Sequence, residues 1–141
     1  MLRYNIDSAS RFVKNSENGA TPLGGLRRAL ISHIVRRDGA ANGTCLGVGS
    51  ICEFGRRDPE IIAASEEAAP LILRPLVRTL ALAQAVGEIR AEVDPQLAAE
   101  ILLTTLNGLK VNARARMSIK RLKEIGSMAL EAFTRGATQA R

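Results

Sequence analysis

The sequence has very few aromatic residues: they make up 3% of its 141 residues, and tryptophan is absent. Runs that alternate β-branched or aromatic residues with polar ones, which are typical of strands, do not occur either. Apolar residues nevertheless reach 46%, so the core has to be built from Leu, Ile, Val and Ala. These are the residues of packed helices. The sequence therefore predicts an all-α fold, with residues 1–141 forming one domain.

Residues that carry chemistry are also scarce. There is one histidine, His33, and there are two cysteines, Cys45 and Cys52. No set of His and Cys residues has zinc-ligand spacing, so no metal site is expected, and the cysteines are typical of buried free thiols in a reducing cytosol. His33 can act as a pH sensor or ligand contact, but a satisfied side chain beside an apolar stripe is the simpler interpretation. We therefore expect a protein that is not an enzyme and needs no cofactor.

Long hydrophobic runs are missing as well. No stretch reaches the ~18 apolar residues that a membrane-spanning helix needs, and no signal peptide opens the chain. The expected location is the cytoplasm, without a membrane partner.

The net charge of +6 is unevenly spread along the chain. Residues 1–57 carry nine basic and four acidic side chains, residues 58–109 carry three and eight, and residues 110–141 carry eight and two. A uniformly basic nucleic-acid binder would not have an acidic middle third. Basic ends that meet nucleic acid and basic ends that are merely solvated both stay open, because charge alone supports solubility and non-specific binding.

Apolar spacing and capping residues predict six helices. Asp58-Pro59 and Asp94-Pro95 each combine a favoured N-cap with a proline at the first helical position. The first pattern is already running at the second residue without a cap, as if the chain began inside a helix. The predicted ranges are 1–14, 21–37, 46–54, 58–86, 94–115 and 118–133.

Two prolines interrupt the longest predicted helix. Pro70 and Pro75 each remove a backbone donor and crowd the preceding turn. We therefore expect a kink or a break between Ala69 and Leu76.

The last two predicted helices carry apolar residues on more than one side. Small residues such as Gly126 and Ala129 allow another helix to approach closely. This pattern indicates a dimerisation pair, in which two helices from each of two chains form a four-helix interface. The residues predicted at this interface are Ile101, Leu102, Thr105, Leu109, Leu122, Ile125, Met128, Ala129 and Ala132.

Several short motifs follow one another in a distinctive order. They are Gly43-Thr44-Cys45-Leu46-Gly47-Val48-Gly49, Arg57-Asp58-Pro59-Glu60, Ala83 with Gly87-Glu88-Ile89-Arg90, Asp94-Pro95, and Leu106-Asn107-Gly108-Leu109-Lys110 with the Ala113-Arg114-Ala115 run. Together they resemble the C-terminal domain of TetR-family transcriptional regulators, over nearly the whole chain to about residue 133. The resemblance implies a helical domain that dimerises through its last two helices and holds a small-molecule pocket among the preceding ones.

The resemblance also implies a ligand and a place for it. The pocket is expected among the helices before Asp94, and the few polar groups there suit a small hydrophobic effector. The residues expected to line it are Ile34, Ile51, Phe54, Leu73, Leu76, Val77 and Leu80.

Members of this family begin with a three-helix DNA-binding head that contains a helix-turn-helix, and this sequence has no such segment. We therefore expect the effector-sensing and dimerisation part of a transcriptional regulator, a repressor, without its DNA-reading head and without specific DNA binding of its own. A headless module that forms heterodimers with intact regulators is one alternative. A small helical enzyme or a direct nucleic-acid binder is another.

Overall fold

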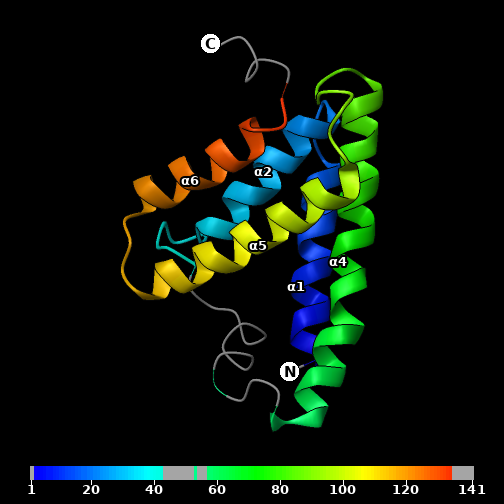
Figure 1. Cartoon of the computed structure of the whole chain (residues 1–141). Helices are drawn as coiled ribbons and strands as arrows, with labels where there is room; N and C mark the ends of the chain where they lie inside the picture. The colour runs from blue at the N-terminus through cyan, green and yellow to red at the C-terminus, as the bar shows by residue number, and fades with distance from the viewer. Residues whose placement is uncertain (1, 43–52, 54–56, 135–141) are drawn as a thin grey trace.

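The computed structural model describes residues 2–42, 53 and 57–134, with side chains from residue 10 onward (Figure 1). The prediction of an all-α fold is confirmed, because the described residues form helices and contain only two isolated β-bridges. The helices are α1 (Leu2–Glu17), α2 (Pro22–Ile34), α4 (Pro59–Ala85), α5 (Pro95–Arg114) and α6 (Ile119–Glu131). The predicted helix over 46–54 lies outside the described residues.

Two layers are visible in Figure 1. Helices α1 and α4 lie side by side and run in the same direction, and α5 and α6 form an antiparallel pair across the upper part of the molecule. Helix α2 lies behind that pair and packs against each of the other four helices. No helix in the described ranges is both long enough and apolar enough to cross a bilayer.

Four helix starts are closed by side-chain caps, as the sequence predicted. In each case a side-chain oxygen accepts a hydrogen bond from a backbone N–H two or three residues later, at 3.0–3.3 Å. This contact satisfies one of the donors that have no partner in the first helical turn. The caps are Thr21, Asp58, Asp94 and Ser118.

Helix α2 ends three residues earlier than predicted. Val35 is extended, at φ −116° and ψ 130°, and pairs with Ala41 in an antiparallel bridge. The backbone N–H of Asn42 donates to the carbonyl of Ile34 at 2.7 Å. Gly39, at φ +82°, lets the chain turn back between these bridged residues. The β-branched Val35 fits this extended segment better than another helical turn.

Of the kink or break predicted for the longest helix, the break is wrong, since α4 continues through both prolines. Pro70 and Pro75 deprive the carbonyls of Glu66 and Leu71 of their usual helical donors. Glu66 and Leu71 are both exposed, so water can satisfy these carbonyls.

The inner face of α4 is buried from Leu76 to Ala83 and holds the helix against the core. The core joins the buried faces of all five helices. Its larger members are Phe12, Leu26, Leu30, Ile34, Leu76, Leu80, Ile89, Leu102, Leu106, Leu109, Leu122, Leu130 and Phe133.

Gly126 allows α6 to lie close to α2. A Cβ at this position would come within 2.6 Å of Leu30 Cδ2 and 3.1 Å of Ile34 Cδ1. The small residue therefore serves packing inside the chain.

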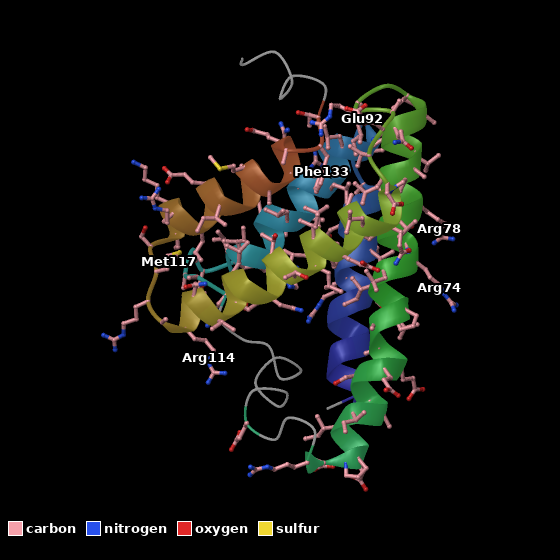
Figure 2. The ribbon with its side chains drawn as sticks, in the orientation of Figure 1. Arg74, Arg78, Glu92, Arg114, Met117 and Phe133 are labelled. Atoms are coloured by element: carbon pink, nitrogen blue, oxygen red, sulfur yellow. The ribbon has the colours of Figure 1, made fainter. Side chains whose placement is uncertain are left out.

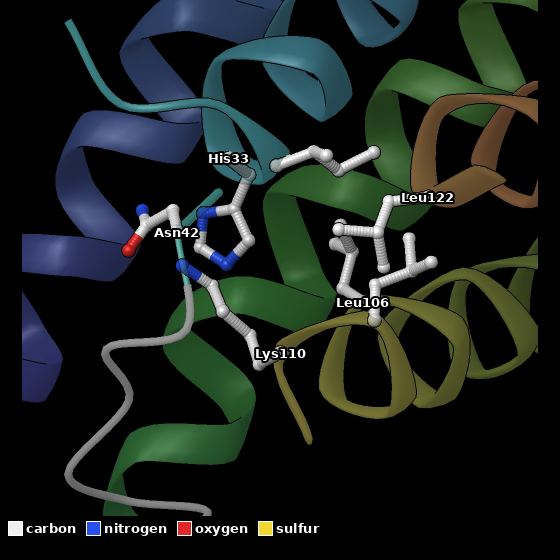
Figure 3. Close-up of a pocket in the computed structure, with 7 residues that line it drawn as sticks. His33, Asn42, Leu106, Lys110 and Leu122 are labelled. Atoms are coloured by element: carbon white, nitrogen blue, oxygen red, sulfur yellow. The ribbon is translucent and has the colours of Figure 1, made fainter. Parts of the chain in front are cut away.

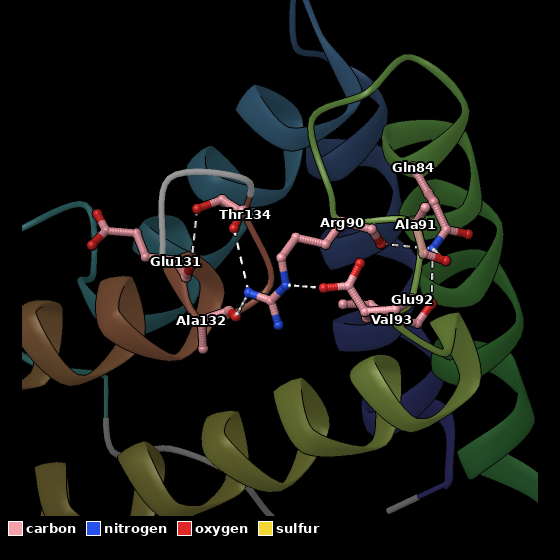
Figure 4. A network of polar contacts seen from close by, with 8 residues as sticks. All are labelled: Gln84, Arg90, Ala91, Glu92, Val93, Glu131, Ala132 and Thr134. Carbon is pink, nitrogen blue, oxygen red and sulfur yellow. Dashed lines mark hydrogen bonds and ion pairs between the residues drawn. The ribbon is translucent and has the colours of Figure 1, made fainter. Parts of the chain in front are cut away.

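The segment between α4 and α5 ties together the ends of several helices (Figure 4). The side-chain amide of Gln84, in the last turn of α4, donates to the carbonyls of Arg90 and Val93 at 2.9 and 2.8 Å. Arg90 Nη1 donates to the Ala132 carbonyl at 2.7 Å, just after α6. Glu88 accepts a hydrogen bond from the backbone N–H of Leu23 in the first turn of α2, at 3.0 Å. We call residues 84–93 the junction segment.

Candidate functional site

A small interior pocket lies between α2, α5 and α6 (Figure 3). The segment that follows α2 closes one side of it. The lining side chains pack so closely that the pocket has no room for a water molecule. The lining residues are His33, Ile34, Asn42, Leu106, Leu109, Lys110 and Leu122.

The pocket has a polar side and an apolar side. In Figure 3 the side chains of His33, Asn42 and Lys110 gather on one side, and Leu106 and Leu122 lie opposite. Lys110 comes from α5 and is only 4% exposed, although it carries a charge. A cation this deeply buried is unusual in a packed core. The pocket therefore combines one buried positive charge with an apolar wall.

His33 is held in its neutral form. Burial, together with the smaller effects of the charges of Lys110 and Arg11, lowers its pKa from 6.5 to about 3. Its ring also packs edge-on against Phe12, with the ring centroids 5.6 Å apart. At neutral pH the imidazole can therefore donate one hydrogen bond and accept another without adding charge.

These residues suit binding better than catalysis. Among the described residues of the lining there is no carboxylate, cysteine or hydroxyl that His33 could activate as a nucleophile. Over residues 2–42, 53 and 57–134, no three His, Cys, Asp or Glu side chains gather as metal ligands would. The arrangement can hold a small molecule with one polar or anionic group and an apolar remainder.

The outward faces of α5 and α6 form a second notable surface. On α5, Leu97, Ile101 and Val111 are each about half exposed, and a Cβ added at Gly108 would meet nothing within 4 Å. On α6, Ile125 is exposed at 38% and Met128 at 74%. We call this surface the outer stripe; it consists of Leu97, Ile101, Gly108 and Val111 on α5, Ile125 and Met128 on α6, and Ala132 directly after α6.

A family model described as "Tetracyclin repressor-like, C-terminal domain" matches residues 25–128. This range runs from the start of α2 nearly to the end of α6 and contains both the interior pocket and most of the outer stripe. The chain belongs to the tetracyclin repressor-like C-terminal domain family. No curated protein and no solved structure matches the chain.

In this tetracyclin repressor-like domain, the residues expected to bind ligand lie in several different places. Ile34 lines the interior pocket. Leu76 and Leu80 are packed in the core, and Val77 lines a separate surface depression. Leu73 is half-buried against the core. Ile51 and Phe54 lie outside the described residues.

The residues expected at the dimer interface divide into two groups. Leu102, Leu109 and Leu122 are buried inside the chain itself, which leaves them no surface to offer to a partner. Thr105 and Ala129 are half-buried, and the rest are exposed. The exposed residues are Ile101, Ile125, Met128 and Ala132.

Sequence reasoning missed several residues on both surfaces. Leu97 and Val111 belong to the outer stripe, and Asn42 and Lys110 to the pocket. A signal for Lys110 was present, because it follows Leu106 by four residues and therefore lies on the same helical face. A lysine among inward-facing leucines is the sequence pattern of a buried cation.

Proposed function

We propose that this chain is the effector-sensing and dimerisation domain of a transcriptional regulator, with repression as its mode of action. The match to the tetracyclin repressor-like C-terminal domain family over residues 25–128 supports this proposal. Domains of this family generally dimerise and bind small effectors. This function requires a site for an effector and a surface through which two chains dimerise.

The outer stripe carries the dimerisation part of the proposal. It is apolar along both helices, and no charged residue lies within it. Each large side chain removed from water contributes roughly 1.5–3 kcal/mol. A second copy that presents the same stripe would bury five such side chains from each chain and form a four-helix interface. The five are Leu97, Ile101, Val111, Ile125 and Met128.

The interior pocket carries the effector part. An effector has to open it, because its lining is closely packed. The residues that would move include Leu106 and Lys110 of α5 and Leu122 of α6, whose helices carry the outer stripe on their opposite faces. A ligand that prefers the opened pocket would therefore shift the geometry of the dimer, and the dimer geometry would shift ligand affinity by the same factor.

The proposal is tested by sedimentation velocity at micromolar concentration. The wild type should sediment as a homodimer, and Ile125→Asp should sediment as a monomer because it places a charge in the outer stripe. Lys123→Asp is the matched control: it changes the charge further, but on the polar side of α6, so the dimer should persist. A wild type that sediments as a monomer contradicts the proposal, and so does a control that dissociates like Ile125→Asp.

A further inference from the structure

A separate depression lies on the surface where the first turn of α5 crosses α4. Its volume is about 540 Å³, within the range of roughly 300–1,000 Å³ that is typical of small-molecule sites. It shares no residue with the interior pocket. The lining residues are Pro70, Leu71, Arg74, Pro75, Val77, Arg78 and Gln96.

Both interior prolines of α4 belong to this depression. Neither has a backbone N–H, so the carbonyl of Leu71 cannot receive the usual hydrogen bond from residue 75. Leu71 itself lies in the wall. The depression therefore combines two rigid apolar rings with a residue whose backbone acceptor lacks its usual helical donor.

Two arginines lie one helical turn apart in the same wall. Among the described residues, the side chains of Arg74 and Arg78 form neither an ion pair nor a hydrogen bond. In Figure 2 both extend from α4 away from the rest of the protein. The carboxylate of Glu100, one turn after Gln96, accepts the Gln96 side-chain amide at 2.8 Å.

This placement stands out against the charge of the surrounding chain. Residues 58–109 hold eight acidic and only three basic side chains. One of the three, Arg90, is bound to the carbonyl after α6 and to Glu92. The other two are Arg74 and Arg78. Both basic side chains of residues 58–109 that lack a partner therefore lie at the depression.

We propose that the depression binds a small organic anion that has an apolar body. A carboxylate or phosphate would accept hydrogen bonds from Arg74 and Arg78, since guanidinium groups match these anions in a planar, bidentate geometry. The apolar part would lie on Pro70, Pro75 and Val77, and the Gln96 amide would add a polar contact. This inference is independent of the function proposed for the interior pocket.

The test uses three probes with the same ten-carbon chain: decanoate, decyl phosphate and decanol. In ¹⁵N NMR titrations of the full chain, the two anions should shift the backbone signals of residues 71–78 and the side-chain amide of Gln96. Decanol should leave these signals in place at the same concentrations. The anion that binds more tightly identifies the carboxylate or the phosphate as the preferred head group.

Matched variants connect this binding to the two arginines. Arg74→Gln/Arg78→Gln should weaken decanoate binding at least tenfold, and Arg78→Gln alone should weaken it less. Lys120→Gln/Lys123→Gln removes the same charge from the exposed face of α6 and should leave the affinity unchanged. All four side chains concerned are exposed, so the variants are expected to fold, and circular dichroism checks this.

Several outcomes would overturn the proposal. Decanol that binds as tightly as decanoate would overturn it, and so would a double arginine variant that binds decanoate like the wild type. Shifts confined to the residues around His33 and Lys110 would assign the anion to the interior pocket instead. A changed sedimentation coefficient in Arg74→Gln/Arg78→Gln would make this face a contact between copies of the chain.

Discussion

The imidazole of His33 is half-buried beside a buried cation, and these surroundings determine its protonation. Burial and the charge of Lys110 both disfavour the imidazolium form, which brings its pKa to about 3. At neutral pH the positive charge of the interior pocket therefore rests on Lys110.

This protonation state predicts how stability depends on pH. The pKa of His33 is 6.5 in the unfolded chain and about 3 in the folded one, so the unfolded chain binds one more proton between these values. The free energy of unfolding should therefore fall as the pH drops below 6.5, by up to about 1.4 kcal/mol per pH unit, and should not change from this source above pH 7.5.

Urea denaturation at pH 7.5, 6.5 and 5.5 measures this slope. The variant His33→Gln cannot titrate and should lose this component, and no other histidine in the sequence can replace it. Equal pH dependence in the wild type and the variant would show that the ring is not held neutral.

The contact between α1 and α2 depends on a glycine. A Cβ on Gly25 would overlap the carbonyl oxygen of Ser16, at the end of α1, whereas a Cβ on Gly24 would meet only the Thr21 hydroxyl at 3.0 Å. The backbones therefore approach each other at Gly25 more closely than any side chain allows. Gly24 has no such role.

Two alanine variants separate these roles. Gly25→Ala should lower the free energy of unfolding by more than about 3 kcal/mol, because a backbone oxygen cannot move aside as a side-chain tip can. Gly24→Ala should change it by less than about 1 kcal/mol, since helix propensity favours alanine there. Thermal unfolding followed by circular dichroism compares the two. Similar losses in both variants would rule out the close backbone contact.

The starts of the helices could be predicted from sequence, but their course could not always be. A cap such as Asp58 acts on backbone groups two or three residues away, so the local sequence is enough. Whether α4 survives Pro70 and Pro75 depends on how firmly Leu76 and Leu80 anchor its inner face in the core. That anchoring comes from other helices, and the local rule for proline does not include it.

The candidate site was harder to predict for a related reason. Helix α5 carries two apolar stripes, one through Leu102 and Leu106 and the other through Leu97 and Ile101. Periodicity finds both but does not say which one faces the core. The interior pocket also draws on α2, α5 and α6 together, and their meeting point is a property of the tertiary fold.

At the scale of the whole molecule, positive charge gathers at the turn between α5 and α6. The basic side chains around this turn are exposed, and Figure 2 shows Arg114 extending from it. They can contact phosphates, but they surround a turn and offer no helix that could enter the major groove. The residues are Arg114, Arg116, Lys120, Arg121 and Lys123.

Any binding of this chain to DNA should therefore be weak and independent of sequence. Fluorescence anisotropy with several unrelated duplexes should give equal affinities, which fall by up to roughly 500-fold between 50 and 200 mM salt if all five cations contact phosphates. Lys120→Gln/Lys123→Gln should make the salt dependence shallower by about two phosphate contacts. A tight complex with one duplex that persists at physiological salt would show that the chain reads sequence itself.

The junction segment also links any movement of α4 to the ends of α2 and α6. Helix α4 has 27 residues and is therefore about 40 Å long. Among the described residues, its C-terminal end is joined to the ends of α2 and α6 through Gln84, Glu88 and Arg90. A rotation of α4 by about 5° about this end would carry its Pro59 end through roughly 3.5 Å. Helix α1, which packs along α4, would move together with α4.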